Sequence, residues 1–167
     1  PQETLPLVYR ILPKELAADV FVNMESDAQE FLIKAFSDTE LREVLDELYV
    51  DDAVDIIEEM PANVVKRILM HTDPVVRKSI NEILKYPEDS AGSIMTIEYV
   101  DLKKYMTVDD AFTRIRRTGV DKETIYICYV TDDNRKLLGL VTVKDLLLSD
   151  KSKKMFEIME TNVISVT

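Results

Sequence analysis

The sequence has few of the residue types on which enzymes and disulfide-linked proteins depend. It contains one cysteine, Cys128, and one histidine, His71, in 167 residues. A single cysteine cannot form an internal disulfide, and a lone histidine has no second histidine to share a zinc ion. Cys128 lies in an apolar run, where we expect a small core residue rather than a nucleophile. No Ser-His-Asp set, phosphate-binding glycine loop or redox pair is present, so we predict that the chain is not an enzyme.

Long apolar runs are also lacking. The longest are "IYICYV" at 125–130 and "LLGLV" at 137–141, well short of the roughly 20 residues that a membrane-spanning helix needs. The opening "PQETLPLVYRILPKEL" has neither the basic start nor the long apolar core of a signal peptide. We therefore expect a soluble chain in a reducing, cytosolic setting.

Basic residues are scarce in the first third of the chain. Residues 1–60 hold 16 acidic and 4 basic side chains, whereas residues 61–167 hold 16 and 17, and the formal net charge is −11. Nucleic acids and anionic membrane surfaces attract basic faces, so neither is an expected partner. Cations are.

Glycine is absent from the first 86 residues, because all three glycines lie beyond residue 90. The segment is rich in Leu, Val, Ile, Ala and Glu, which favours helix. From residue 13 it divides into six copies of a twelve-residue repeat: PKELAADVFVNM, ESDAQEFLIKAF, SDTELREVLDEL, YVDDAVDIIEEM, PANVVKRILMHT and DPVVRKSINEIL.

Each copy of this repeat has the pattern of one short helix. Position eight is aliphatic in all six copies, and position twelve is large and apolar in five, with Thr72 as the exception. Prolines and capping residues fall in the first two positions, where a helix begins. Such helices are marginal alone but can bury a continuous core when stacked. We predict a right-handed superhelix of short helices over residues 5–86; a plain helical bundle with fewer, longer helices is the alternative.

The pattern changes after "LKYPEDSAGSIMT". Tyr86 precedes Pro87 and is disfavoured in a helix, so the superhelix is expected to end there. Val100 and Leu102 indicate a short strand, and a T-x-x-D capping signature, Thr107 with Asp110, precedes a helix. The segment "TIYICYVT" reads as a buried strand, "LLGLVT" as a second strand and "VKDLLL" as a helix, which gives the order β-α-β-β-α.

These residues resemble a known family. The segment "GLVTVKDLL" is similar to the end of a cystathionine-β-synthase-type (CBS) domain, and "YPEDSAGSIMT", "ETIYICYV" and the acidic helical repeats accompany it. Together they resemble the cytosolic part of MgtE-type magnesium transporters. The resemblance implies a mixed α and α/β fold with three parts: a helical domain over residues 1–86, a first CBS domain over 87–153, and the start of a second CBS domain over 154–167.

The same resemblance implies partners and a setting. Family members continue through a second CBS domain, a connecting helix and a transmembrane pore, so we expect this chain to be a piece of a longer protein. Its expected place is the cytoplasmic face of the cell membrane. Because the family pairs its CBS domains, we also expect a homodimer.

The stretch "YVDDAVDIIEEMP" at 49–61 gathers carboxylates without a basic residue. On a helix, Asp51, Asp55 and Glu58 fall on one face, opposite the apolar Ala53, Ile56, Ile57 and Met60. An ordinary solvated face is one interpretation. A magnesium site is the other, because Mg²⁺ prefers carboxylate oxygens and is often held by only one or two of them.

The resemblance favours magnesium at this face. In the family, magnesium between the helical and CBS domains neutralises facing carboxylates and favours the closed channel. The matching acidic positions here are Asp51 and Asp55, with Asp19 in the first repeat and a backbone carbonyl near Ser93 as a further candidate. The expected function is therefore a magnesium-sensing regulatory region.

An adenine-nucleotide-sensing CBS module is the alternative function, with ATP as the ligand. In CBS domains the hydroxyl and aspartate of a "TVKD" segment commonly hold ribose and phosphate, which places Thr142, Lys144 and Asp145 in nucleotide-binding positions. A simpler interpretation is a capped helix that begins at Thr142.

Overall fold

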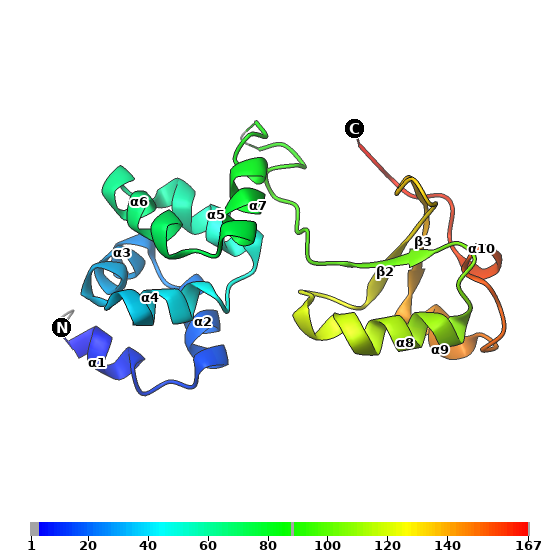
Figure 1. Cartoon of the computed structure of the whole chain (residues 1–167), viewed down its shortest axis with the longest axis horizontal. Coiled ribbons are helices and arrows are strands. Elements are labelled where there is room, and N and C mark those ends of the chain that lie inside the picture. The colour runs from blue at the N-terminus through cyan, green and yellow to red at the C-terminus, as the bar shows by residue number, and fades with distance from the viewer. Residues whose placement is uncertain (1–3, 88, 167) are drawn as a thin grey trace. The chain divides into compact units, whose positions relative to one another are not determined.

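The computed structural model describes residues 4–87 and 89–166, without the side chains of residues 15 and 121. The chain forms two compact units, residues 1–95 and 96–167. Figure 1 shows the first unit as helices and the second as a small sheet with helices. Among the described residues, no helix has both the length and the apolar character to cross a membrane.

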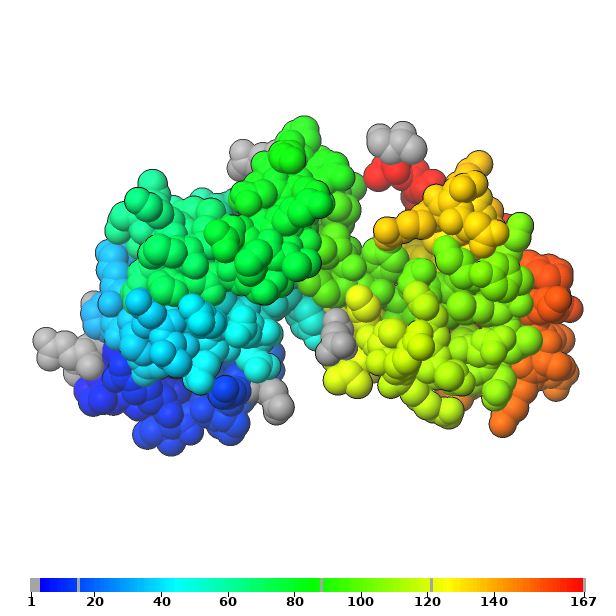
Figure 2. Space-filling model, viewed as in Figure 1, coloured from blue at the N-terminus to red at the C-terminus, as the bar shows by residue number. Residues whose placement is uncertain are grey.

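The first unit, here called the helical unit, contains seven α-helices in its described part. They are α1 (Leu5–Tyr9), α2 (Lys14–Val22), α3 (Ser26–Ala35), α4 (Asp38–Leu45), α5 (Val50–Glu59), α6 (Ala62–His71) and α7 (Pro74–Ile83). Helices two places apart pack together, as α2 does with α4, α4 with α6 and α5 with α7. In the space-filling view these helices form one packed surface, from blue α1 to green α7 (Figure 2).

The twelve-residue repeat governs where each helix begins. The residue before the first helical turn is position one of every copy: Pro13, Glu25, Ser37, Tyr49, Pro61 and Asp73. Position eight is buried in five copies, as Leu32, Val44, Ile56, Ile68 and Ile80. One short helix per copy confirms the repeat and excludes the bundle of fewer, longer helices.

The segment after α7 folds back on the helical unit. A Cβ atom on Gly92 would lie 2.4 Å from the Tyr86 ring, so only glycine fits against that ring. Ser93 is buried, and its hydroxyl donates to the Ser90 carbonyl at 2.9 Å. The compact helical unit includes residues up to 95, so this turn belongs to it.

The second unit, here called the CBS unit, is built on a three-stranded sheet in the order β1-β2-β3. The strands are β1 (Val100–Lys103), β2 (Ile127–Thr131) and β3 (Leu137–Thr142), and the helices are α8 (Val108–Thr118), a 3-10 turn η2 (Gly119–Asp121), α9 (Val143–Leu148) and α10 (Met155–Ile158). β1 runs parallel to β2, and β2 runs antiparallel to β3. The predicted order β-α-β-β-α is confirmed, with α10 added.

One strand is shorter than its pattern indicates. The run 124–131 predicts a strand along its whole length, but β2 begins at Ile127. The reason is local: the Tyr126 amide donates to the Thr124 hydroxyl at 3.2 Å, a turn that competes with strand pairing.

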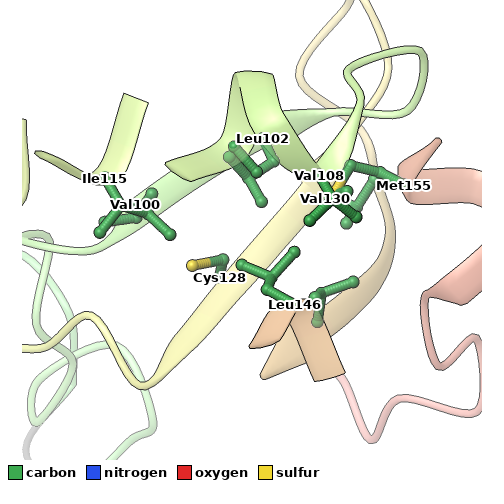
Figure 3. Close-up of a cluster of buried hydrophobic side chains, with 10 residues drawn as sticks. Val100, Leu102, Val108, Ile115, Cys128, Val130, Leu146 and Met155 are labelled. Carbon is green, nitrogen blue, oxygen red and sulfur yellow. The ribbon is translucent and has the colours of Figure 1, made fainter. Parts of the chain in front are cut away.

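The core of the CBS unit lies between the sheet and its helices. Figure 3 shows Val100, Leu102, Cys128 and Val130 from the strands converging with residues of α8, α9 and α10. Alternate residues of β1 and β2 face this core, as the period of two in a strand requires. α8 and α9 lie side by side below the sheet in this view (Figure 1).

Residues 154–160 complete this core. Met155 is fully buried in it, and residues 140 and 160 form a β-bridge with N–H···O distances of 3.0 and 2.9 Å. The start of the segment expected to open a second CBS domain is therefore packed against the first CBS unit.

Candidate functional sites

Helix α5 separates apolar and acidic residues on opposite faces. Its buried residues are Val50, Ala53, Val54, Ile56 and Ile57, followed by buried Met60 at the helix end. Asp55, Glu58 and Glu59 are exposed, while Asp51 and Asp52 are partly buried in the first turn. The predicted division of this helix is confirmed: one face packs in the core and the other carries carboxylates.

The exposed carboxylates of α5 have no cationic partner in the described part of the chain. No described lysine, arginine or histidine lies within ion-pair distance of Asp55, Glu58 or Glu59. Other acidic residues of the helical unit do pair, such as Glu40 with Arg10 at 2.6 Å. The face is therefore available to a cation from solution.

A cleft of about 190 Å³ lies beside this face. Asp52, Asp55 and Glu59 line it, and Gln29 lies opposite with Val22 and Met24. The Gln29 side chain is held in place by a hydrogen bond to the Phe21 carbonyl at 2.8 Å. Asp51, Asp55 and Glu58 were predicted as the acidic face, although the spacing 52, 55, 59 also places three carboxylates on one helical stripe.

The other predicted magnesium ligands are dispersed. Asp19 is exposed on α2 and does not line the α5 cleft. Ser93 lies in the turn after Gly92, within the helical unit. Among the described residues, no three acidic, histidine or cysteine side chains are close enough to hold one metal ion by themselves. A magnesium ion at Asp51 or Asp55 would thus keep much of its water or take a ligand from elsewhere.

The predicted nucleotide-binding residues lie where β3 meets α9. The Thr142 hydroxyl donates to the Asp145 carboxylate at 2.5 Å and accepts from the Asp145 amide at 3.1 Å. These hydrogen bonds with Thr142 hold the pKa of Asp145 below its usual value. The pair forms a capping box, so the simpler interpretation of a capped helix is confirmed for these two residues.

An open groove of about 610 Å³ adjoins this cap. Thr142 and Lys144 line it together with Tyr126, which is 76% exposed, and with the apolar side chains Ile127, Val143, Leu147 and Leu148. Asp145 does not line it. The apolar members were not predicted from the sequence; Ile127 begins β2, and Val143, Leu147 and Leu148 belong to α9.

The Cys128 thiol is unreactive at neutral pH. It is fully buried in the core of the CBS unit, and burial raises the pKa of its thiol to about 11. Since the thiolate is the reactive form, the prediction of a core residue is confirmed.

A helical unit of twelve-residue repeats followed by a CBS unit, with a carboxylate face on the former, defines a class of proteins that joins an acidic helical domain to a CBS domain. The profile of the MgtE intracellular N domain matches residues 1–89, and that of the CBS domain matches residues 91–151. The chain belongs to the MgtE family.

Two curated relatives are magnesium transporters named MgtE. The one from Thermus thermophilus is 35% identical over 164 residues, covering 96% of this chain and 36% of its own length. The one from Bacillus subtilis is 27% identical, covering 88% of this chain and 33% of its own length. The chain thus spans about a third of the length of these relatives, which are transporters rather than enzymes.

Two solved structures share the fold. The cytosolic domain of the Mg²⁺ channel MgtE in complex with ATP is 34% identical with a TM-score of 0.92, covering 99% of this chain and 68% of that one. The soluble part of a magnesium transporter is 27% identical with a TM-score of 0.88, covering 99% and 65%. The mixed α and α/β fold predicted from the sequence is confirmed.

Proposed function

We propose that this chain is the magnesium-sensing regulatory region of a magnesium transporter or channel. One observation carries the proposal: in a member of the MgtE family, helix α5 presents exposed carboxylates that no described basic residue neutralises. Such a face binds a divalent cation from solution with a gain in electrostatic energy, because carboxylates three and four residues apart repel one another.

The mechanism is a linkage between ion binding and conformation. Magnesium ions held at Asp51, Asp55, Asp19 or the carbonyl near Ser93, each by one or two of these groups and otherwise by water, would bind a compact arrangement of the chain better than an open one. A ligand shifts an equilibrium by its difference in affinity for the two states. High magnesium therefore favours compaction, which in the longer protein closes the transmembrane pore on the cytoplasmic side.

The decisive comparison is magnesium chloride against sodium chloride at equal ionic strength, because salt alone screens surface charge. Magnesium should protect residues 86–93, the segment "YPEDSAGS" after α7, from proteolysis and raise the melting temperature, whereas sodium should do neither. Asp51→Asn with Asp55→Asn should abolish the magnesium response. The matched control is Asp27→Asn with Glu47→Gln, which removes two exposed charges from the same unit. A full response in the first double variant would refute the assignment of these aspartates.

Assembly is a further part of the proposal. The CBS unit exposes apolar side chains on α9 and α10, including Leu147 at 68% and Phe156 at 54%. A second copy of the chain that covers them would form the homodimer expected of the family. Sedimentation at high protein concentration should give a dimer, and a persistent monomer would count against it.

Nucleotide binding is the second candidate function. It is favoured by the groove beside Thr142 and Lys144, and by the relative whose cytosolic domain was solved with ATP. In this chain, Tyr126 offers a face for a base, and Lys144 offers a charge for phosphate. Titration calorimetry with ATP should show binding that Lys144→Gln weakens, while Lys151→Gln, an exposed lysine outside the groove, should leave it unchanged. Equal affinity in both variants would exclude Lys144 from the site.

A further inference from the structure

A second cleft in the helical unit differs from the α5 face because basic side chains line it as well as acidic ones. It has a volume of about 330 Å³, and its charged lining comes from Arg42 and Asp46 at the end of α4, His71 at the end of α6, and Asp73 and Arg77 at the start of α7. Neither of the functions proposed above uses it. Since one water occupies about 30 Å³ in the liquid, the cleft has room for a small hydrated ion.

The arginines of this cleft differ from the other two arginines of the helical unit. Arg10 pairs with Glu40 at 2.6 Å, and Arg67 pairs with Asp38 at 3.0 Å. Arg42 and Arg77 form no ion pair with any described carboxylate. In a region where acidic residues greatly outnumber basic ones, two guanidinium groups without a carboxylate partner face one cleft.

Two buried polar atoms of the cleft residues also lack partners. Arg77 Nε and His71 Nδ1 have no hydrogen bond in the described structure. Arg77 makes one long hydrogen bond, from Nη2 to the Thr72 carbonyl at 3.3 Å, so turning its guanidinium toward an occupant would cost little. Because nearly all buried polar atoms in folded proteins are hydrogen-bonded, two orphans on residues of one cleft favour an occupant that supplies their partners once these side chains turn toward it.

The contacts of His71 restrict what that occupant can be. His71 Nε2 lies 3.3 Å from the Asp38 carboxylate, which can only accept, so Nε2 carries the proton. In the neutral ring Nδ1 is then an acceptor and needs a donor. The arginines need an acceptor, preferably an oxyanion. A hydrogenphosphate group has both features, since it presents oxygens to guanidinium and an O–H to imidazole, whereas sulfate presents acceptors alone.

The two acidic residues of the cleft oppose an anion unequally. The Asp73 carboxylate caps α7 by accepting from the amides of Val75 and Val76 at 2.8 and 3.4 Å, which offsets much of its charge. Asp46 is exposed and acts as the main like charge. It should weaken an anion site without abolishing it.

We propose that this cleft binds a hydrogenphosphate group, either as free phosphate or on a phosphomonoester, through Arg42, Arg77 and His71. The site is separate from the magnesium face and from the nucleotide groove, and either of those functions can fail without affecting it. It would give the helical unit of this chain a second ligand, of opposite charge to magnesium.

An NMR titration of the whole 167-residue chain, free of magnesium, tests the proposal. Inorganic phosphate and, separately, glycerol 3-phosphate are compared with sulfate and chloride at equal ionic strength. Phosphate should shift the signals of His71 and Arg77 with a dissociation constant on the order of millimolar. A stronger response to glycerol 3-phosphate would identify a phosphorylated metabolite as the ligand, and a stronger response to phosphate would identify the free ion. An equal response to sulfate would overturn the proposal.

Four variants separate a built site from general electrostatic attraction. Arg77→Gln should weaken phosphate binding about tenfold or more, since a charge-assisted hydrogen bond is lost. Lys66→Gln removes the same charge from an exposed position on α6 outside the cleft and should change little. Asp46→Asn should tighten binding. Arg42→Gln, which alters an exposed residue, serves if Arg77→Gln fails to fold. Unchanged affinity in both arginine variants would overturn the proposal.

Discussion

The two units of this chain reach stability through different kinds of contact. In the helical unit the main helix contacts are between helices two or three places apart in sequence order, as in α5 with α7 and α3 with α6. In the CBS unit β1 pairs with β2 although α8 lies between them in the sequence, and Met155 of α10 packs into the same core. The first is a set of neighbouring repeats, and the second is a single core to which every element contributes. A repeat array should lose order locally, whereas a single core should be lost as a whole.

Truncation of buried side chains should show the difference between the two units most clearly. Ile80 in α7 and Leu146 in α9 are both fully buried, and truncation to alanine at such sites costs about 2–5 kcal/mol. Leu146→Ala should lower hydrogen-exchange protection throughout the CBS unit. Ile80→Ala should lower it in α5 and α7 and much less in α2 and α3. If α2 and α3 lose protection as fully as α7, the helical unit unfolds as one body and the distinction fails.

The next largest loss of stability is expected where residues 159–160 lie close to Gly139 of β3. A Cβ on Gly139 would lie 2.5 Å from the Glu160 carbonyl oxygen, so Gly139→Ala must push residues 159–160 away from β3. Overpacking of this kind costs about 1–3 kcal/mol. Gly119→Ala is the comparison variant, because its new Cβ would meet side chains rather than backbone, Ile125 Cγ2 at 2.8 Å and Ile115 Cγ2 at 3.6 Å. Urea unfolding should rank Gly139→Ala well below Gly119→Ala, and equal stabilities would show that residues 159–160 are not needed by the CBS unit.

The same contrast explains what the sequence could predict. A twelve-residue period is local information, so the helix in each copy and the buried position eight followed directly from it. Strand β3, helix α9 and the capping boxes at Thr107 and Thr142 were likewise readable, because each rests on neighbouring residues. The return of Met155 to the core was not, because its partners lie far away in sequence and no local pattern marks them.

The candidate sites were predictable to the same extent. The carboxylate face of α5 follows from helical periodicity alone. Asp52 and Glu59 line a cleft together with Gln29 and Met24. That cleft depends on how the α2–α3 corner packs on α5, which is a tertiary contact that helical periodicity does not predict. The phosphate cleft joins Arg42 and Arg77 from helices of different repeats, and no motif connects them.

Acid should weaken the helical unit through one identifiable ion pair. The Arg10 guanidinium, with the backbone and hydroxyl of Ser37, lowers the pKa of Glu40 from 4.5 to about 2. A depressed pKa in the folded state means that the ionised carboxylate stabilises the fold fully above pH 4.5 and loses that contribution as the pH falls toward 2. Glu40→Gln should therefore flatten the acid limb of a pH–stability curve, measured by circular dichroism.

The control for this change is Glu47→Gln, which alters an exposed carboxylate of the same unit. Its curve should keep the wild-type slope below pH 4.5, the usual pKa of the Glu40 carboxyl group. A Glu40→Gln curve that also keeps that slope would mean that Arg10 and Ser37 do not hold Glu40 in solution.

The smallest expected effect concerns the α5 face itself. Asp55 lies four residues after Asp51 and three and four before Glu58 and Glu59, so it repels up to three carboxylates at helical spacing. Each like-charge pair costs about 0.2–0.5 kcal/mol, and Asp55→Asn should therefore raise stability slightly in magnesium-free, low-salt buffer. Glu82→Gln should have the opposite effect, because the Glu82 carboxylate lies 3.9 Å from the Lys78 ammonium one turn away. Loss of this ion pair should lower stability by a similar amount. Both effects should fade near 1 M salt, where the screening length falls to about 3 Å. Thermal unfolding of the two variants in low and high sodium chloride measures these stability differences. If Asp55→Asn is less stable than the unaltered chain at low salt, the Asp55 charge has a partner within the protein and is not free to bind a cation from solution.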